Sequence, residues 1–138
     1  MEAAPKILIV EDERMIAEYF KILVEAMGYG VCGIAKSADE AVRLAREEDP
    51  ALIFMDVRLA GVRDGVDAAN EIYRHKAVPT VYVTGSNEQE TIDRIKADHP
   101  SDILIKPVLA EQIEDALSRF CPRHGGPGGP SVSGESAG

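Results

Sequence analysis

The sequence predicts an α/β fold in which helices cover both faces of a five-stranded parallel sheet, the doubly wound arrangement. Short apolar runs without polar alternation, typical of strands buried on both faces, alternate five times with helical patterns. Short connections between these segments also favour a single doubly wound sheet. The run from Leu52 to Met55 stops abruptly at Asp56, and open parallel sheets place their ligand sites at such carboxyl ends.

The first half of the chain supplies three strands and two helices. We expect strands over residues 6–10, 31–35 and 52–55. Between the first two, apolar residues recur at steps of three and four, the pattern of one face of an amphipathic helix that ends at Gly28: Met15, Ile16, Tyr19, Phe20, Leu23, Val24 and Met27. Ser37 and Glu40 have the spacing of a capping box, which predicts a helix that ends before Asp49.

The second half continues the same alternation. A loop over residues 57–64 precedes a helix over 66–75, a strand over 80–83 and a helix over 87–98. Residues 102–105 form the fifth strand and residues 109–120 the last amphipathic helix. We therefore expect one domain over residues 1–121. Residues 122–138 are rich in Gly, Pro and Ser, which predicts a disordered tail.

Composition narrows the class of protein. The chain has 138 residues, 45% hydrophobic and 28% charged, as expected of a globular domain. A formal net charge of -9 without a Lys/Arg cluster argues against nucleic-acid binding. No apolar stretch approaches a membrane span of roughly 20 residues, and the start of the chain does not read as a signal peptide, so we expect a cytoplasmic protein without membrane insertion. Cys32 and Cys121 lack metal-ligand spacing and are expected to be free thiols.

Polar residues with complementary chemistry follow four different strands. Glu11 and Asp12 follow the first strand, Asp56 the third, Thr84 the fourth and Lys106 the fifth. Taken singly, each has a simpler explanation, such as a turn or a helix cap. Together, three carboxylates at one edge of a sheet repel one another unless a cation holds them, and oxygen ligands alone favour Mg²⁺. Asp56 would then be a carboxylate nucleophile that forms an acyl phosphate, with Thr84 and Lys106 stabilising the phosphoryl group.

These segments carry a resemblance to a known family. The chain resembles the CheY-like receiver domain of two-component response regulators over residues 5–120, through four motifs in the family's order: Ile7-Leu8-Ile9-Val10-Glu11-Asp12, Ile53-Phe54-Met55-Asp56, Val83-Thr84-Gly85 and Ile105-Lys106-Pro107. The resemblance implies a flavodoxin-like (βα)5 fold with strand order 2-1-3-4-5. It also implies signal transduction through an aspartyl phosphate.

The family pattern assigns roles to the residues that match it. Asp56 would take a phosphoryl group from a phosphohistidine of a sensor histidine kinase or a histidine phosphotransfer protein. Asp12, Asp56 and the backbone carbonyl of Arg58 would bind Mg²⁺, with Glu11 reaching the ion directly or through water. The chain would be a phosphoacceptor with self-catalysed phosphotransfer and autodephosphorylation, rather than an enzyme acting on a separate substrate.

Several positions depart from the common pattern or adjoin the site. The acid pair is Glu-Asp rather than Asp-Asp, and the loop after Asp56 is one residue longer than usual and lacks Met-Pro. Arg58 and Ser86 flank the site and are expected to tune the lifetime of the phosphoryl group, whereas Gly85 leaves access to it open. Ile103 occupies the switch position where many receivers carry an aromatic residue. We therefore expect activation to shift the Thr84 loop and the next helix without an aromatic flip.

We expect the chain to pass its signal on by contacting another protein. Without an effector segment after residue 120, the chain reads as a stand-alone receiver that binds a downstream protein or relays phosphoryl groups. The family's usual output face, formed by the fourth helix, the fifth strand and the last helix, is acidic here: Glu88, Glu90, Asp93, Glu111, Glu114 and Asp115.

Four alternatives remain open at this stage. The chain could be a receiver fragment of a larger hybrid kinase or regulator, or a degenerate receiver used as a constitutive interaction module. A flavodoxin-like cofactor binder would need a phosphate loop after the first strand, where Glu11 and Asp12 repel phosphate. A phosphatase with an aspartyl intermediate would need a second carboxylate near Asp56, and Arg58 stands there instead.

Overall fold

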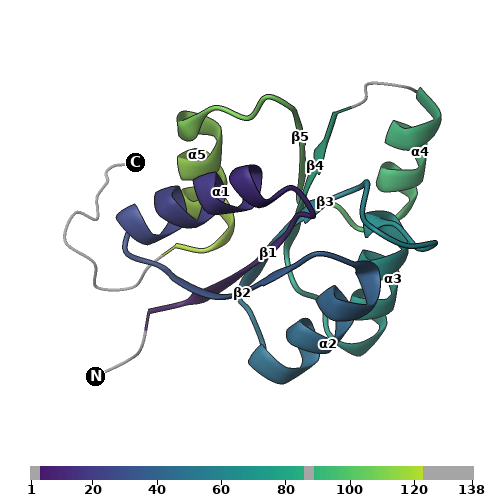
Figure 1. Ribbon diagram of the computed structural model, residues 1–138, viewed down its shortest axis with the longest axis horizontal. Helices are drawn as coiled ribbons and strands as arrows, with labels where there is room; N and C mark the ends of the chain where they lie inside the picture. The colour runs from purple at the N-terminus through teal and green to yellow at the C-terminus, as the bar shows by residue number, and fades with distance from the viewer. Residues whose placement is uncertain (1–3, 86–88, 123–138) are drawn as a thin grey trace.

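The computed structural model describes residues 4–85 and 89–122 and contains one five-stranded parallel sheet (Figure 1). Its strand order is β2-β1-β3-β4-β5, which confirms the predicted fold and topology. The strands are β1 (Lys6–Val10), β2 (Gly30–Ala35), β3 (Leu52–Asp56), β4 (Thr80–Thr84) and β5 (Asp102–Ile105). The predicted tail lies outside the described residues apart from Pro122.

Within the described residues, five helices cover the two faces of this sheet. Helices α1 and α5 lie on one face, and α2, α3 and α4 lie on the other (Figure 1). Their bounds are α1 (Arg14–Ala26), α2 (Ala38–Glu48), α3 (Gly65–His75), α4 (Gln89–Ala97) and α5 (Ala110–Phe120). None of the helices in the described ranges is long and apolar enough to cross a membrane.

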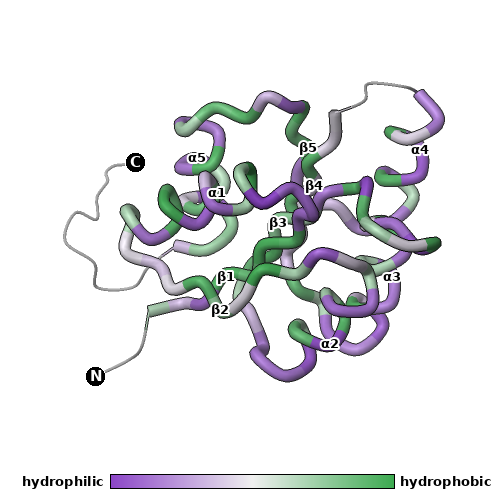
Figure 2. The backbone as a smooth tube through the Cα atoms, in the orientation of Figure 1, coloured by the Kyte–Doolittle hydropathy of each residue, from purple (hydrophilic) through white to green (hydrophobic). Residues whose placement is uncertain are grey.

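The strands divide their side chains between two hydrophobic cores. Alternate residues of β3 show the division, because Phe54 packs with α1 and α5 while Ile53 and Met55 pack with α2 and α3. β3 and β4 are buried along their whole length, which explains why their sequences lack polar alternation. The apolar segments accordingly follow the strands through the middle of the molecule (Figure 2).

Local signals in the sequence set the ends of several helices. Ser37 caps α2 by accepting a hydrogen bond from the Glu40 amide at 3.2 Å. Asp64 caps α3 in a capping box with Asp67. The side chain of each residue accepts a hydrogen bond from the backbone amide of the other at 3.0 Å. Asp49 ends α2 with a positive φ of 51°. The predicted N-terminal cap of α4 lies outside the described residues.

The predicted amphipathic helix is present as α1, but its apolar face is covered only in part. Phe20 and Val24 are buried, and Ile16, Leu23 and Met27 pack against the core while partly exposed, whereas Met15 is 85% exposed and Tyr19 is 40% exposed. Seven positions span a wider arc of the helix than the sheet and α5 cover. The uncovered apolar side chains therefore lie on the surface, close to the carboxyl ends of the strands.

Candidate functional site

The carboxyl edge of the sheet brings together the residues that the sequence predicts. Asp56 and Thr84 are the last residues of β3 and β4, and both are buried. Glu11 directly follows β1 and is also buried. Lys106 directly follows β5, where its amide donates to the Thr84 carbonyl at 2.9 Å. Four strand ends thus converge as expected of a parallel sheet.

Lys106 links two buried carboxylates. Its Nζ donates to Asp56 Oδ2 at 3.3 Å and lies 3.2 Å from Glu11 Oε1. The other oxygen of Glu11, Oε2, accepts a hydrogen bond from the Glu13 amide at 3.1 Å. The ammonium is thereby held beside the carboxylate that is the candidate nucleophile.

Three carboxylates form a candidate cation site. Glu11, Asp12 and Asp56 each offer an oxygen, and these oxygens lie within 4.8 Å of one another. Glu11 and Asp56 are buried, whereas Asp12 is exposed, so the site opens to solvent on one side. Carboxylate oxygens in an open site suit a hard divalent ion that keeps bound water. The acidic residues predicted as ligands therefore fit Mg²⁺, and the fourth predicted ligand, the carbonyl of Arg58, stays a prediction.

Burial and charge perturb both partners of the central ion pair. Burial, followed by the negative charge of Glu11, raises the pKa of Asp56 to about 7, and Lys106 offsets only part of this rise. Burial lowers the pKa of Lys106, but Asp56 and Glu11 more than offset this and the net shift is upward. Near neutral pH without a cation, Asp56 is therefore partly protonated and Lys106 is charged.

The raised pKa of Asp56 predicts a pH-dependent stability in the absence of metal. Unfolded aspartate loses its proton near pH 4, whereas folded Asp56 keeps it to about pH 7. Between these values the folded state binds more protons, so its stability should fall as pH rises, by about 2 to 4 kcal/mol from this group. Thermal unfolding in EDTA at pH 5 and pH 8 should show this fall in the wild type and a smaller fall in Asp56→Asn.

Added Mg²⁺ provides the complementary measurement. Because the cation favours deprotonated carboxylates, it should raise the melting temperature of the wild type more at pH 8 than at pH 5. Equal melting temperatures of Asp56→Asn and wild type at pH 8 in EDTA would contradict the raised pKa.

The other predicted site residues have mixed outcomes. Arg58 is exposed next to the site, and its influence on phosphoryl lifetime stays a prediction. Gly85 is exposed, and a Cβ added there would meet Lys106 Cδ only at 4.0 Å, so the glycine leaves open space beside the ammonium. Ser86 lies outside the described residues. Ile103 is half-buried on β5 and packs against the core beneath α2, α3 and α4.

Gly65 is a site residue that the sequence reasoning did not identify. It is the first residue of α3, and its amide donates to the Val57 carbonyl at 2.7 Å. A Cβ added to Gly65 would lie 2.0 Å from the Asp56 carbonyl oxygen. The Asp64-Gly65 pair at the end of the loop was the available signal, but the close approach depends on the path of the loop.

A groove lies beside the candidate nucleophile. It has a volume of about 580 Å³ and is lined by α1 and by the segment after β5, with Gly85 and Lys106 also in its lining. Its apolar lining comes from both sides: Ile16, Tyr19, Phe20, Pro107, Val108 and Leu109. Leu109 is 57% exposed, and Met15, beside Ile16 on α1, is 85% exposed. The exposed positions of α1 therefore border the entrance to the site.

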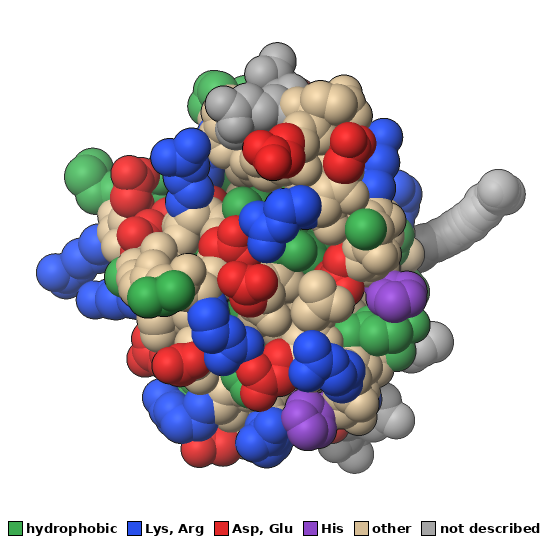
Figure 3. All heavy atoms as spheres, turned by 90° about the vertical axis from the view of Figure 1, so that its right-hand side faces the viewer, with side chains coloured by type: hydrophobic (Ala, Val, Ile, Leu, Met, Phe, Trp, Pro, Cys, Tyr) green, Lys and Arg blue, Asp and Glu red, His purple; other side chains and the backbone are tan. Residues whose placement is uncertain are grey.

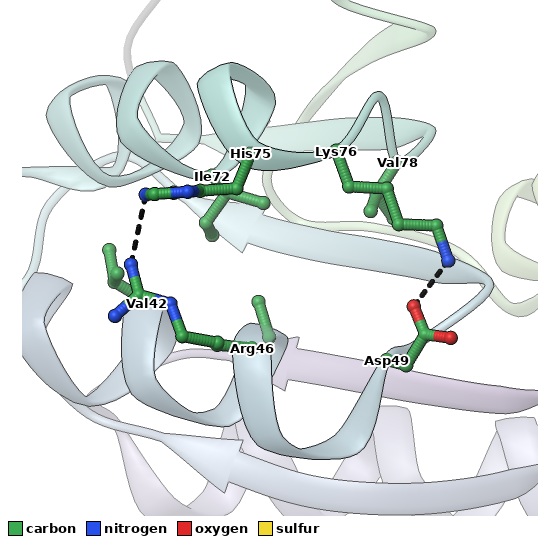
Figure 4. Close-up of a pocket in the computed structure, with 8 residues that line it drawn as sticks. Val42, Arg46, Asp49, Ile72, His75, Lys76 and Val78 are labelled. Carbon is green, nitrogen blue, oxygen red and sulfur yellow. Dashed lines mark hydrogen bonds and ion pairs between the residues drawn. The ribbon is translucent and has the colours of Figure 1, made fainter.

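A second hollow lies at the opposite edge of the sheet. It has a volume of about 210 Å³ between the carboxyl ends of α2 and α3 (Figure 4). Arg46 donates to His75 Nε2 at 2.9 Å at one end, and Lys76 pairs with Asp49 at the other. These contacts join the two helices far from Asp56, so the hollow is separate from the candidate site.

The comparisons with known proteins agree with this geometry. Residues 7–118 match the model of the response regulator receiver domain. The chain therefore belongs to the response regulator receiver family of two-component signalling. It is 33% identical over 119 residues to the phyllosphere-induced regulator PhyR of Methylorubrum extorquens, a match covering 86% of this chain and 44% of that protein. The chain spans about half the length of the curated relatives it matches.

Two solved structures illustrate the likeness. The signal receiver domain of a modulated diguanylate cyclase from Desulfovibrio desulfuricans G20 is 34% identical with a TM-score of 0.79, covering 85% of this chain and 93% of that one. The receiver domain of sensor histidine kinase PA1611 from Pseudomonas aeruginosa PAO1 is 27% identical with a TM-score of 0.77, covering 86% and 98%. That second structure holds a magnesium ion in its active-site cleft.

Proposed function

We propose that Asp56 accepts a phosphoryl group from a phosphohistidine of a sensor histidine kinase or a histidine phosphotransfer protein in the cytoplasm. The observation that carries the proposal is the buried Asp56 carboxylate, which has the Lys106 ammonium at 3.3 Å and two further carboxylates beside it. Glu11, Asp12, Asp56 and the carbonyl of Arg58 are the proposed Mg²⁺ ligands. The phosphoryl state of Asp56 then controls the binding of a downstream protein or the onward relay of the group.

The proposed reaction is a direct displacement at phosphorus. An Asp56 carboxylate oxygen forms a bond to phosphorus, and the bond between phosphorus and the donor imidazole nitrogen breaks with its electron pair going to the nitrogen. Lys106 and the Thr84 hydroxyl stabilise the charge on the phosphoryl oxygens. Bound Mg²⁺ supplies further neutralisation of that charge and favours the ionised form of Asp56. The chain itself is thus a phosphoacceptor that assists its own phosphorylation and dephosphorylation.

The groove along α1 has the position and the lining that a phosphodonor-binding surface would need. A donor histidine must come close to Asp56, and the lining of the groove includes Lys106, whose Nζ lies 3.3 Å from Asp56 Oδ2. Apolar side chains exposed on a helix, such as Met15 and Tyr19, are suited to packing against a partner helix. We therefore propose this groove as the contact for the histidine-bearing protein.

Phosphorylation with a small-molecule donor tests the proposed function directly. Incubation with acetyl phosphate and Mg²⁺ should add one phosphoryl group per chain, detected by intact mass, and hydroxylamine should remove it because an acyl phosphate is labile to that nucleophile. Asp56→Asn should not be labelled. Asp49→Asn, which alters an exposed aspartate at the opposite edge of the sheet, is the matched control and should be labelled like the wild type.

The same experiment separates the alternatives. Absence of labelling in the wild type, together with no response to the phosphoryl mimic beryllofluoride, would contradict the proposal and favour a constitutive interaction module. Labelling that persists in Asp56→Asn would place the acceptor elsewhere.

The residues around Asp56 are expected to set the lifetime of the phosphoryl group. Arg58→Ala replaces an exposed side chain two positions after the acceptor. We expect this change to alter the autodephosphorylation rate by about threefold to tenfold, because the side chain is exposed only two positions after the acceptor. Decay of the labelled protein, followed by mass, measures it. An unchanged rate in both Arg58→Ala and Ser86→Ala would exclude the proposed role of these flanking residues.

A further inference from the structure

A third buried carboxylate lies outside the phosphoacceptor site. Asp98 directly follows α4, and its side chain is only 4% exposed. The Tyr82 hydroxyl donates a hydrogen bond to Asp98 Oδ2. The other oxygen, Oδ1, is buried and has no hydrogen-bond partner in the part of the chain that the structure describes. His99 Nδ1 lies 3.7 Å from that oxygen.

This carboxylate occupies an unfavourable position. A buried charge needs full pairing to offset the loss of hydration, and here one oxygen has a single neutral donor. The Asp98 amide donates to the Ile95 carbonyl at 3.1 Å, so the residue continues the last turn of α4, where the helix dipole also disfavours a negative charge. A displacement of this end of α4 that returned Asp98 to water would relieve both costs.

Tyr82 connects Asp98 to the strand that carries Thr84. Tyr82 is fully buried on β4, two residues before Thr84, and the side chains at these positions point to the same face of the sheet. In the parallel register, Tyr82 lies directly beside Ile103 of β5, the switch position without an aromatic residue. An aromatic ring is therefore present at this place in the sheet, but it is supplied by β4. Burial, followed by the hydrogen bond to Asp98, raises the pKa of Tyr82, so its hydroxyl remains a donor.

Helix α4 contributes little to the hydrophobic core, although the ring of His99, just after it, stacks on Tyr73 of α3 with the ring centroids 3.9 Å apart. Ile95 is the only fully buried residue of α4 within the described part of the chain, whereas α3 buries five. On the surface, Arg94 of α4 forms a two-pronged ion pair with Asp64 at 2.7 and 3.3 Å. Asp64 caps α3 at the end of the loop that begins at Asp56. The hydrogen bond to Tyr82 and the ion pair with Asp64 thus lead to segments that carry phosphoacceptor-site residues. Arg94 also lies 3.6 Å from Asp67 of α3, within the mixed charged surface on this side of the molecule (Figure 3).

We propose that the hydrogen bond from Tyr82 to Asp98 is a latch that holds α4 in its resting position and opens when Asp56 is phosphorylated. This inference rests on the proposed phosphorylation of Asp56. Drawing Thr84 toward the phosphoryl group displaces the end of β4 relative to α4, which strains a contact that is already poorly compensated. Release of Asp98 then frees the carboxyl end of α4 and changes the surface that α4 presents to a partner.

The proposed latch predicts how the affinity for a phosphoryl mimic changes when the hydrogen bond is removed. Because it stabilises only the resting state, its removal should favour the state that binds a phosphoryl mimic. Tyr82→Phe, which removes only the hydroxyl, should raise the affinity for beryllofluoride with Mg²⁺ about fivefold. In amide NMR spectra without the mimic, the α4 signals of this variant should move toward those of the beryllofluoride-bound wild type.

A second variant and a matched control complete the test. Asp98→Ala removes the acceptor, and its effect on affinity should not add to that of Tyr82→Phe, because both changes break the same bond. Tyr29→Phe also removes a buried hydroxyl, one that donates to the Cys121 carbonyl at 2.6 Å beyond α5, and should leave the affinity unchanged.

Two results would overturn the latch in different ways. Unchanged affinity and unchanged α4 signals in Tyr82→Phe, in a protein whose Thr84 and Lys106 signals respond to beryllofluoride, would overturn the latch alone. No response of the Thr84 and Lys106 signals in the wild type would overturn the proposed function and the latch together.

Discussion

Lys106→Ala is expected to lower the rate of Asp56 phosphorylation by acetyl phosphate about 100-fold at pH 7. Two effects combine. The ammonium lies 3.3 Å from Asp56 Oδ2, where it would stabilise charge on an incoming phosphoryl group in the proposed reaction. It also opposes the rise in the pKa of Asp56 that burial and Glu11 cause, a pKa that is about 7 with Lys106 in place, so loss of the ammonium should raise this pKa further and leave more Asp56 protonated and unable to attack. Initial rates of labelling, followed by intact mass, measure the combined loss.

The two effects can be separated by pH. Raising the pH to 9 should restore part of the rate of Lys106→Ala by deprotonating Asp56, whereas the loss of charge stabilisation should persist at every pH. Lys76→Ala is the matched control, because it removes a lysine from an exposed ion pair with Asp49 at the other end of the sheet, and it should be labelled at the wild-type rate. A rate of Lys106→Ala within a factor of three of the wild type would show that the ammonium does not assist the transfer.

Most of the fold follows from patterns that depend on the chain alone. The predicted third strand matches β3 to within one residue, because a strand buried on both faces must be apolar throughout and end where polar residues begin. The predicted fifth strand has the bounds of β5, an edge strand that is only partly buried. The site could be predicted for a related reason. Parallel strands share one carboxyl edge, so Glu11, Asp56, Thr84 and Lys106 had to meet once the strands were placed.

The parts that could not be predicted depend on how elements are oriented in three dimensions. The exposure of Met15 and Tyr19 depends on how far α1 is rotated on the sheet, and seven apolar positions do not fix that angle. The contact between Tyr82 and Asp98 joins residues 16 positions apart and depends on where α4 ends relative to β4. The sequence does not indicate that these two residues are in contact, since a buried Tyr and an Asp after a helix are each common on their own.

Gly65 also escaped prediction, and its substitution is expected to have the largest effect on stability. In Gly65→Ala the new Cβ would lie 2.0 Å from the Asp56 carbonyl oxygen, 2.9 Å from the Asp56 carbonyl carbon and 3.0 Å from Val57 Cα. All three are backbone atoms, so no side-chain rotation can relieve the overlap. The loop and the start of α3 must move, at a cost of about 3 kcal/mol measured as the free energy of unfolding in urea.

The displacement should also reduce phosphorylation, because the atoms that must move belong to Asp56 itself. Gly30→Ala is the matched control: a Cβ at Gly30 meets nothing closer than the Pro5 carbonyl oxygen at 3.9 Å, so the change should cost little and leave labelling intact. We expect Gly65→Ala to be labelled at least about tenfold more slowly than Gly30→Ala, since small misplacements of a reacting group cost large factors in rate. Equal stability and equal labelling of the two variants would mean that the loop after Asp56 accommodates a side chain, and Gly65 would then have no role in positioning the acceptor.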